Sequence, residues 1–276
     1  MKPRRWFRFS LRGLFLLMLV IAVSLGWTLY KVRQQGIALA ALKKVGCKFN
    51  YDKADIRSPT VLEWLRKLLG EDESRSVSGV NGESSQITDA GLVHLQGLTQ
   101  LTELNLDGAQ VTDAGLVHLR GLTQLQYLFL DRTQVTDAGL VHLQDLTQLQ
   151  GLGLQRTQVI DAGLVHLRGL TKLQRLHLND THVTDAGLAH LRGLTQVQQL
   201  ELVGTQVTDA GLVHLRGWTQ LQYLFLHGTQ VTDAGLVHLQ GLTQLEFVDI
   251  NGTQVTDAGV RQLRKALPNC NILWQP

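Results

Sequence analysis

Seven of the ten histidines recur at one position of a 24-residue repeat, and histidine is a common metal ligand and acid–base group. This histidine ladder comprises His94, His118, His142, His166, His190, His214 and His238. On a helical wheel, His142 lies about 160° from the midpoint of Leu140 and Leu143, which predicts that these imidazoles face solvent. Neighbouring helices pack about 8–10 Å apart, too far for two imidazoles to share a zinc ion at Zn–N distances of about 2.0–2.1 Å. We therefore expect no metal site in the ladder.

An aspartate recurs in the same repeat, within the motif T-D-A-G. The threonine stands at Thr88, Thr112, Thr136, Thr184, Thr208, Thr232 and Thr256, whereas Ile160 replaces it in one copy and the aspartate occurs in all eight. For that reason we interpret Asp137, rather than Thr136, as the helix N-cap, a contribution of about 1 kcal/mol. The carboxylates form a row without catalytic partners. The sequence has no nucleophile elbow, phosphate-binding glycine loop or HExxH motif, so we expect no enzyme and no cofactor.

The repeat itself predicts the elements that carry these residues. It occurs as seven full units and a truncated eighth. In LTQLQYLFLDRTQVTDAGLVHLQD (122–145), Leu125, Leu128 and Leu130 follow L-x-x-L-x-L, which indicates a strand with inward-pointing leucines, and Leu140 and Leu143 then indicate a short helix. The predicted fold is α/β: a leucine-rich-repeat solenoid, or horseshoe, with a parallel concave sheet and short convex helices over residues 77–276.

A threonine also recurs where the leucine-rich consensus usually has asparagine. It is found at Thr133, Thr157, Thr181, Thr205, Thr229 and Thr253, with Ala109 as the exception. We expect a buried hydroxyl that bonds backbone groups where the strand bends away.

The amino-terminal segment is typical of a membrane anchor. Residues 14–30 read LFLLMLVIAVSLGWTLY, which contains no charge, and at about 1.5 Å per residue they span roughly 25 Å of a ~30 Å hydrocarbon core. Residues 1–13 are basic, and fewer positive charges follow the apolar run. This asymmetry predicts one transmembrane helix in the cytoplasmic membrane, with residues 1–13 in the cytoplasm and the repeats outside it.

Two other interpretations of this segment stay open. Ala22, Val23 and Ser24 offer small residues for signal-peptide cleavage, although the apolar run continues to Leu29 and favours an uncleaved anchor. The pair Arg4 and Arg5 also resembles part of a twin-arginine signal.

Residues 31–76 are predicted to be a juxtamembrane αβ segment and a cap. IALAALKKVG (37–46) has helical spacing and CKFNYD (47–52) alternates like a strand. A second helix is predicted over residues 58–72, with Ser58 as N-cap and Pro59 at the first helical position. It would cover the apolar edge of the first coil or, alternatively, lie on a lipid surface.

The charge distribution argues against nucleic-acid binding. Residues 1–84 contain 15 Lys and Arg against 7 Asp and Glu, whereas residues 85–276 contain 11 against 16. The repeats are therefore mildly acidic and lack the basic stripe of a nucleic-acid-binding face. The two cysteines, Cys47 and Cys270, stand at opposite ends of an elongated chain and imply no disulfide.

The outward positions of the strands are the part of the repeat that varies most. The candidate ligand-binding residues on this concave face are Tyr127, Phe129, Arg175, His177, Asn179, Tyr223, Phe225 and Phe247. At about 4.8 Å per strand, the two Tyr/Phe pairs stand roughly 19 Å apart, separated by a hollow at Gly151 and Gly153 and by the polar residues. This arrangement suits an extended peptide with two apolar anchors and an acidic group. Alternatively, the identical TQLQYLFL segments (123–130 and 219–226) are copies of one another, with aromatics favoured because they suit strands.

The repeats resemble bacterial leucine-rich-repeat proteins built on L-T-x-L-x-x-L-x-L-x-x-T-x-V-T-D-A-G-L. FSLRGLFLLMLVIAVSLGW and WLRKLLGED are similar to the N-terminal layout of single-pass bacterial membrane proteins that carry such repeats. The resemblance implies a membrane-anchored, extracytoplasmic scaffold that binds a protein or peptide on its concave face. A structural spacer of the cell envelope is the alternative, and an enzyme is disfavoured.

Overall fold

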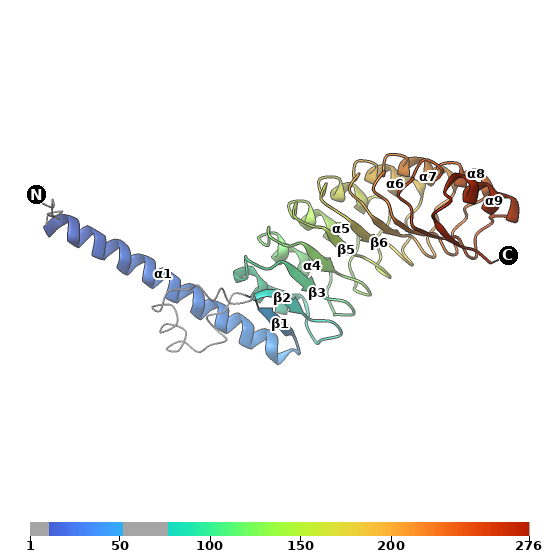
Figure 1. The fold of residues 1–276 in the computed structure, drawn as a ribbon. Coiled ribbons are helices and arrows are strands. Elements are labelled where there is room, and N and C mark those ends of the chain that lie inside the picture. Colours follow the sequence, from blue (N-terminus) through green and yellow to red (C-terminus); the bar gives the residue numbers. More distant parts are fainter. Residues whose placement is uncertain (1–10, 52–76, 276) are drawn as a thin grey trace, which may run out of the picture.

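The computed structural model describes residues 11–51 and 77–275, and within them a long helix joins a curved stack of coils (Figure 1). The helix predicted over residues 58–72 lies outside the described residues. Helix α1 (Leu11–Lys44) projects from one end of the stack, and the C-terminus lies at the other. By length and composition, α1 from Gly13 onward is able to cross a membrane.

One strand per coil builds a single sheet of ten strands whose order follows the sequence. β1 (Lys48–Tyr51) pairs antiparallel with β2, and every later neighbour is parallel, with each residue beside its counterpart in the next repeat. The strands are β2 (Val77–Asn81), β3 (Glu103–Asn105), β4 (Tyr127–Phe129), β5 (Gly151–Gly153), β6 (Arg175–His177), β7 (Gln199–Glu201), β8 (Tyr223–Phe225), β9 (Phe247–Asp249) and β10 (Asn271–Leu273). The predicted parallel concave sheet is thereby confirmed.

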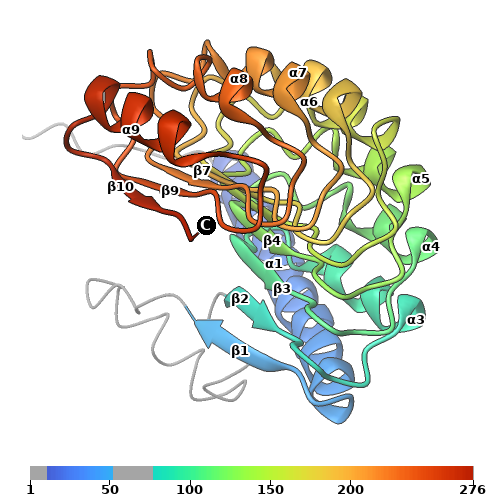
Figure 2. The same ribbon diagram turned by 90° about the vertical axis from the view of Figure 1, so that its right-hand side faces the viewer.

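Short helices cover the outside of the arc, and the sheet lines its inside (Figure 2). The α-helices are α3 (Asp89–Leu92), α4 (Asp113–Leu116), α5 (Asp137–Leu140), α6 (Asp185–Leu191), α7 (Asp209–Leu212), α8 (Asp233–Leu236) and α9 (Asp257–Ala266). The 3-10 helices are η1 (Val93–Gly97), η2 (Val117–Leu119), η3 (Val141–Leu143), η4 (Gly163–Leu167) and η5 (Val213–Leu215).

The core lies between the sheet and the helices and is filled by the repeated leucines. Leu128 and Leu130 from the strand and Leu140 and Leu143 from the convex side are all fully buried. The recurrent threonine is structural, as expected: Thr133 is buried, and its hydroxyl donates to the carbonyl of Leu130 at 2.6 Å. This bond closes the turn where the chain leaves the sheet.

The T-D-A-G motif corrects the interpretation of the aspartate as N-cap. Thr136 is the N-cap of α5, and its Oγ1 accepts a hydrogen bond from the N–H of Ala138. Asp137 is instead the first residue of the helix, and its carboxylate accepts from the N–H of Ile160 in the next coil at 2.8 Å. The corresponding carboxylate connects coils in every copy from Asp89 to Asp233, whereas Asp257 in the last copy pairs with Arg261 of its own helix. Ile160 cannot accept a capping bond through its side chain, and its coil forms only the 3-10 helix η4.

Both ends of the stack are capped. The helix predicted over 37–46 is not separate, because α1 continues without a break to Lys44 and buries Leu39 and Leu42 in the core of the first coil. Gly46, with φ of +92°, then turns the chain into β1, which confirms the predicted strand. Within the described residues, α1 and β1 therefore cap the first coil. At the other end, Trp274 Nε1 donates to the carbonyl of Val255 at 3.1 Å.

Candidate binding face on the concave sheet

The strand register arranges the outward side chains of β3 to β9 in two rows. Because each residue pairs with its counterpart 24 positions later, the first outward position of each strand forms one row and the second forms another. The first row is Glu103, Tyr127, Gly151, Arg175, Gln199, Tyr223 and Phe247; the second is Asn105, Phe129, Gly153, His177, Glu201, Phe225 and Asp249. The predicted candidate residues of the strands all lie in these rows, and Asn179 follows β6.

The hollow predicted at Gly151 and Gly153 is wrong, because both glycines are buried beneath side chains of the preceding coil. A Cβ on Gly151 would lie 2.8 Å from Cδ1 of Tyr127. The hydroxyl of Tyr127 donates to Gln150 Oε1 at 3.2 Å, so this ring lies across the glycine and is held there. The carboxylate of Asp131 covers Gly153 in the same way. The glycines make room for these side chains. The ring of Tyr127, from the first Tyr/Phe pair, is therefore packed against the protein rather than fully available to a ligand.

The second Tyr/Phe pair has different surroundings and forms an aromatic cluster with β9. The rings of Phe225 and Phe247 are tilted by 43° with centroids 5.3 Å apart, a favourable aromatic contact. Tyr223 is 37% exposed, and its hydroxyl donates to Glu246 Oε2 at 2.9 Å. This hydrogen bond to a carboxylate raises the pKa of Tyr223. We call Tyr223, Phe225 and Phe247 the aromatic cluster.

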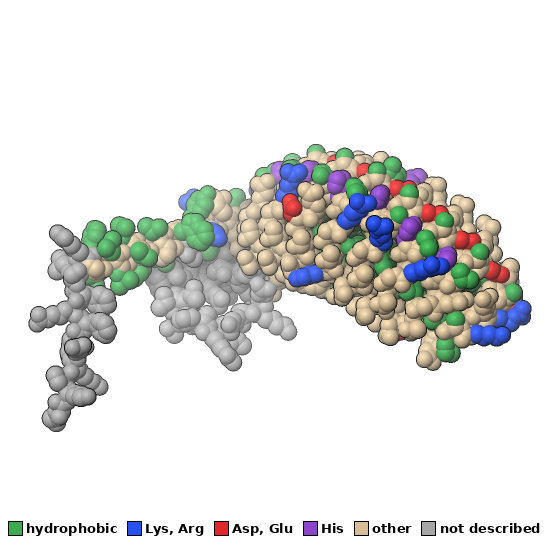
Figure 3. Space-filling view, turned by 90° about the horizontal axis from the view of Figure 1, so that it is seen from above, with side chains coloured by type: hydrophobic (Ala, Val, Ile, Leu, Met, Phe, Trp, Pro, Cys, Tyr) green, Lys and Arg blue, Asp and Glu red, His purple; other side chains and the backbone are tan. Residues whose placement is uncertain are grey.

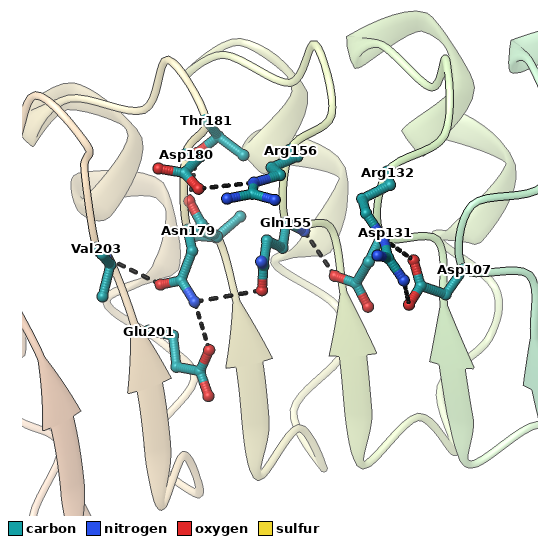
Figure 4. Close-up of polar contacts among 11 residues, drawn as sticks. Asp107, Asp131, Arg132, Gln155, Arg156, Asn179, Asp180, Thr181, Glu201 and Val203 are labelled. Carbon is teal, nitrogen blue, oxygen red and sulfur yellow. Dashed lines mark hydrogen bonds and ion pairs between the residues drawn. The ribbon is translucent and has the colours of Figure 1, made fainter. Parts of the chain in front are cut away.

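A polar network occupies the middle of the face (Figure 4). Glu201 accepts from Asn179 Nδ2 at 2.6 Å and from Gln199 Nε2 at 2.7 Å, and His177 Nε2 lies 3.5 Å from it. Asn179 Oδ1 in turn accepts from the N–H of Val203 at 2.9 Å. Asn179 therefore links β6 to the coil of β7, a structural use that competes with ligand contact.

Arg175 differs from the other polar candidates because its side chain is exposed. No hydrogen bond or ion pair joins it to another side chain in the part of the chain that the structure describes. Its guanidinium is free to contact a ligand.

Charged side chains at the edge of the face form a second group that the sequence analysis did not select. Arg132, Arg156 and Asp180 adopt positive φ at the turn position where other coils have glycine. Arg132 makes a two-point ion pair with Asp107 at 2.7 and 2.6 Å, and Arg156 Nε lies 3.0 Å from Asp180 (Figure 4). The sequence contained one signal for this group: in three successive coils a charged residue replaces the glycine of the turn. Such a replacement is informative because non-glycine residues with positive φ are uncommon.

Asp131 stands between this edge and the polar network. It accepts from the N–H of Gln155 at 2.7 Å, and burial raises the pKa of its carboxyl. The raised pKa results from its position beneath the concave surface, over Gly153. The same geometry makes Asp131 a packing residue of this face.

The histidine ladder lies on the convex side, but its members are half-buried rather than fully in solvent as predicted (Figure 3). Three of them contact the Arg or Gln of the preceding coil: Gln96 Nε2 is 2.7 Å from His118 Nδ1, Arg168 contacts His190, and Arg216 Nε donates to His238 Nδ1 at 3.2 Å. Burial, aided by a neighbouring arginine, lowers the pKa of His142 and His238. Among the described residues, no group of three or more His, Cys, Asp or Glu side chains is arranged to hold a metal ion.

Comparisons with known proteins agree with this geometry. Residues 97–119 and 169–191 match the Leucine Rich repeat family model. This chain folds as a leucine-rich-repeat solenoid. Internalin C2 from Listeria monocytogenes has a similar structure, with a TM-score of 0.59 and 25% identity over 72% of this chain and 81% of internalin C2. A leucine-rich-repeat protein from Leptospira interrogans aligns with a TM-score of 0.45 and 18% identity, over 65% of this chain and 56% of that protein. A search of curated proteins found no match.

Proposed function

We propose that this leucine-rich-repeat solenoid is a membrane-anchored, extracytoplasmic scaffold that binds a protein or peptide on its concave face. Solenoids of this kind present extended concave surfaces for binding partners. The observation that carries the proposal is the aromatic cluster on the variable rows, where Tyr223 is exposed and Phe225 and Phe247 are half-buried, while the core positions repeat almost unchanged. Aromatic side chains presented in this way are typical of binding hot spots.

The anchor is supported by the surface of α1. The apolar side chains between Leu14 and Leu25 are exposed, and packing within the described solenoid does not account for them (Figure 3). Trp27 and Tyr30 come next, each 61% exposed, as expected where a helix leaves the hydrocarbon. Lys31 Nζ lies 3.8 Å from the centroid of the Trp27 ring, so a cation and an aromatic ring meet at that boundary.

A comparative pull-down tests the binding function. The full chain, solubilised from membranes in mild detergent, is compared with a variant that carries Tyr223→Ser, Phe225→Thr and Phe247→Thr. We expect a stoichiometric partner that the variant loses while its thermal midpoint is retained. Recovery of the same partner by the folded variant would contradict the concave site, and the absence of any stoichiometric partner would favour the spacer.

A separate experiment tests the topology. Protease is added to intact spheroplasts, and the repeats are detected by an antibody to the C-terminal segment. We expect loss of the repeats without lysis. Full protection until the membrane is broken would contradict an extracytoplasmic solenoid, whatever the result of the pull-down.

A further inference from the structure

We propose that the aromatic cluster is the subsite for a cationic side chain, so that the partner presents a basic segment with Arg or Lys beside apolar residues. This inference rests on the proposed function and gives the chemistry of the ligand. It adds a basic group to the sequence-based expectation, which was a ligand with two apolar anchors and an acidic group. The chemistry of the subsite depends on which charges surround the three rings.

Carboxylates lie on both sides of the cluster. The register places Phe225 between Glu201 on β7 and Asp249 on β9, about 4.8 Å away on each side. Glu246 stands at the outer edge, where it accepts the hydrogen bond from Tyr223. An aromatic ring between carboxylates attracts a cation twice, through the ring quadrupole and through the neighbouring negative charges.

Among the described residues, this part of the face has no Lys or Arg to offset these carboxylates; its imidazoles are His177, whose Nε2 lies 3.5 Å from Glu201, and His227, which follows β8. Strands β7 to β10 and the two residues after each contain neither Lys nor Arg. The nearest Lys or Arg among the outward positions is Arg175 on β6, two strands from Tyr223 and about 9.6 Å away. The cationic subsite is therefore limited to β7–β9, and Arg175 is free to meet an anionic group of the same ligand on its other side.

Hydrogen bonds within the protein also fix the orientation of the carboxylates. Asp249 Oδ1 accepts from the N–H of Asn251 at 3.0 Å, and Glu201 accepts from Asn179 and Gln199. The rings of Phe225 and Phe247 hold each other by their tilted contact. A preorganised surface of this kind loses little conformational entropy when it binds.

The other Tyr/Phe pair supplies an internal comparison. Tyr127 and Phe129 are the same residue types on β4, but β5 offers Gly151 and Gly153 where β9 offers Phe247 and Asp249. The ring of Tyr127 is folded over Gly151, whereas both tyrosine hydroxyls are used within the chain, that of Tyr127 by Gln150 and that of Tyr223 by Glu246. Identical residues therefore form a continuous aromatic and acidic surface on β8 and β9 but not on β4 and β5.

Selection from a random peptide library tests the chemistry. The full chain is placed in nanodiscs of phosphatidylcholine, a zwitterionic lipid that does not itself attract basic peptides. A phage-displayed library of random dodecapeptides is depleted on empty nanodiscs and then selected on the loaded ones. We expect enrichment of Lys and Arg next to apolar residues, and dissociation constants that rise with salt concentration.

Two variants locate the site of the selected peptides. The first carries Tyr223→Ser, Phe225→Thr and Phe247→Thr, and the second carries Glu246→Gln and Asp249→Asn, which removes charge but keeps an acceptor oxygen at each position. We expect binding to weaken at least about ten-fold in both. The matched control, Tyr127→Ser with Phe129→Thr, removes the same residue types from β4 and is expected to change binding less than about three-fold.

The outcomes separate the inference from the function on which it rests. Peptides enriched in Asp and Glu, or without charge preference, that still need the aromatic cluster would overturn the cationic subsite and leave the binding scaffold standing. Basic peptides that bind the charge variant unchanged would also overturn it. If no peptide distinguishes loaded from empty nanodiscs, and the pull-down returns no partner, the proposed function itself fails.

Discussion

The carboxylate of Asp113 accepts two hydrogen bonds from Thr136 in the following coil, one from its backbone N–H at 2.8 Å and one from its hydroxyl at 2.6 Å. The same hydroxyl accepts from the N–H of Ala138 and so caps helix α5. In the motifs that begin at Thr112, Thr136, Thr184, Thr208 and Thr232, Thr thus caps its own helix and Asp fastens the next coil. The two hydrogen bonds between an aspartate and the next coil recur from Asp89 to Asp233. At Ile160, which has no hydroxyl, only the bond from the backbone N–H is present.

The first prediction concerns this link between coils. Asp113→Ala removes both acceptors and leaves the N–H and hydroxyl of Thr136 without them, so we expect unfolding free energy to fall by about 1–3 kcal/mol. Asp113→Asn keeps one acceptor oxygen, and its cost should be smaller. The control is Asp145→Ala, because Asp145 is exposed and has no hydrogen bond within the described residues; its effect should stay within about 0.5 kcal/mol. Equal effects of the two alanine variants in denaturant titrations would contradict this assignment.

The glycine of the motif gives the second prediction. A Cβ on Gly139 would lie 2.4 Å from Asp113 Oδ1, so the residue must be glycine for the aspartate of the preceding coil to reach Thr136. We expect Gly139→Ala to cost about 1–3 kcal/mol through overpacking. Gly121→Ala is the matched control, since nothing lies within 4 Å of its Cβ.

A double-mutant cycle identifies the cause of the Gly139 effect. When Asp113→Ala is combined with Gly139→Ala, the oxygen that clashes is gone. The combined cost should therefore be less than the sum of the two single costs by more than about 0.5 kcal/mol. Simple additivity would show that Gly139 is needed for another reason.

Sequence spacing was sufficient for the fold because the leucines that define it act within one repeat. Leu128, Leu130, Leu140 and Leu143 are separated by the period of a strand or a helix, and all are buried as that spacing predicts. The role of Asp137 could not be obtained in this way. Its partner is 23 residues away, and a repeat read in isolation offers only the local capping interpretation, which was wrong.

The concave face was predicted in part for a related reason. Alternation along the strands placed Tyr127, Arg175 and Tyr223 correctly on the outward rows. It did not reveal that the ring of Tyr127 crosses to the next coil and fills the space above Gly151, because that depends on the side chain of a neighbouring repeat. Two identical TQLQYLFL segments therefore have different surfaces, because the strand next to each one in the sheet carries different side chains.

The third prediction is a dependence of stability on pH. Burial and a nearby arginine hold the pKa of His142 and His238 below the usual value of about 6.5, so the folded protein binds fewer protons than the unfolded chain near that pH. Stability should then be full above pH of about 6.5 and fall as the pH drops toward the folded pKa values. Measured between pH 7.5 and 5.5, the thermal midpoint should decrease, and less so for a variant with His142→Gln and His238→Gln. An identical decrease in both proteins would contradict a role for these two histidines.

The last prediction concerns the junction between α1 and the solenoid, where the same helix carries the exposed apolar run and the cap. Leu42 is fully buried against the first coil, whereas Leu25 is 44% exposed. Leu42→Ala should cost about 2–5 kcal/mol locally, as large-to-small changes in cores do, and Leu25→Ala serves as the control. Because each coil contacts only its neighbours, the loss should be confined to the end of the stack. Hydrogen exchange of the full chain in nanodiscs should show lower protection in β1 and β2 and unchanged protection in β8 and β9. Equal loss of protection along the whole sheet would mean that the solenoid unfolds as one unit and that the cap stabilises all of it.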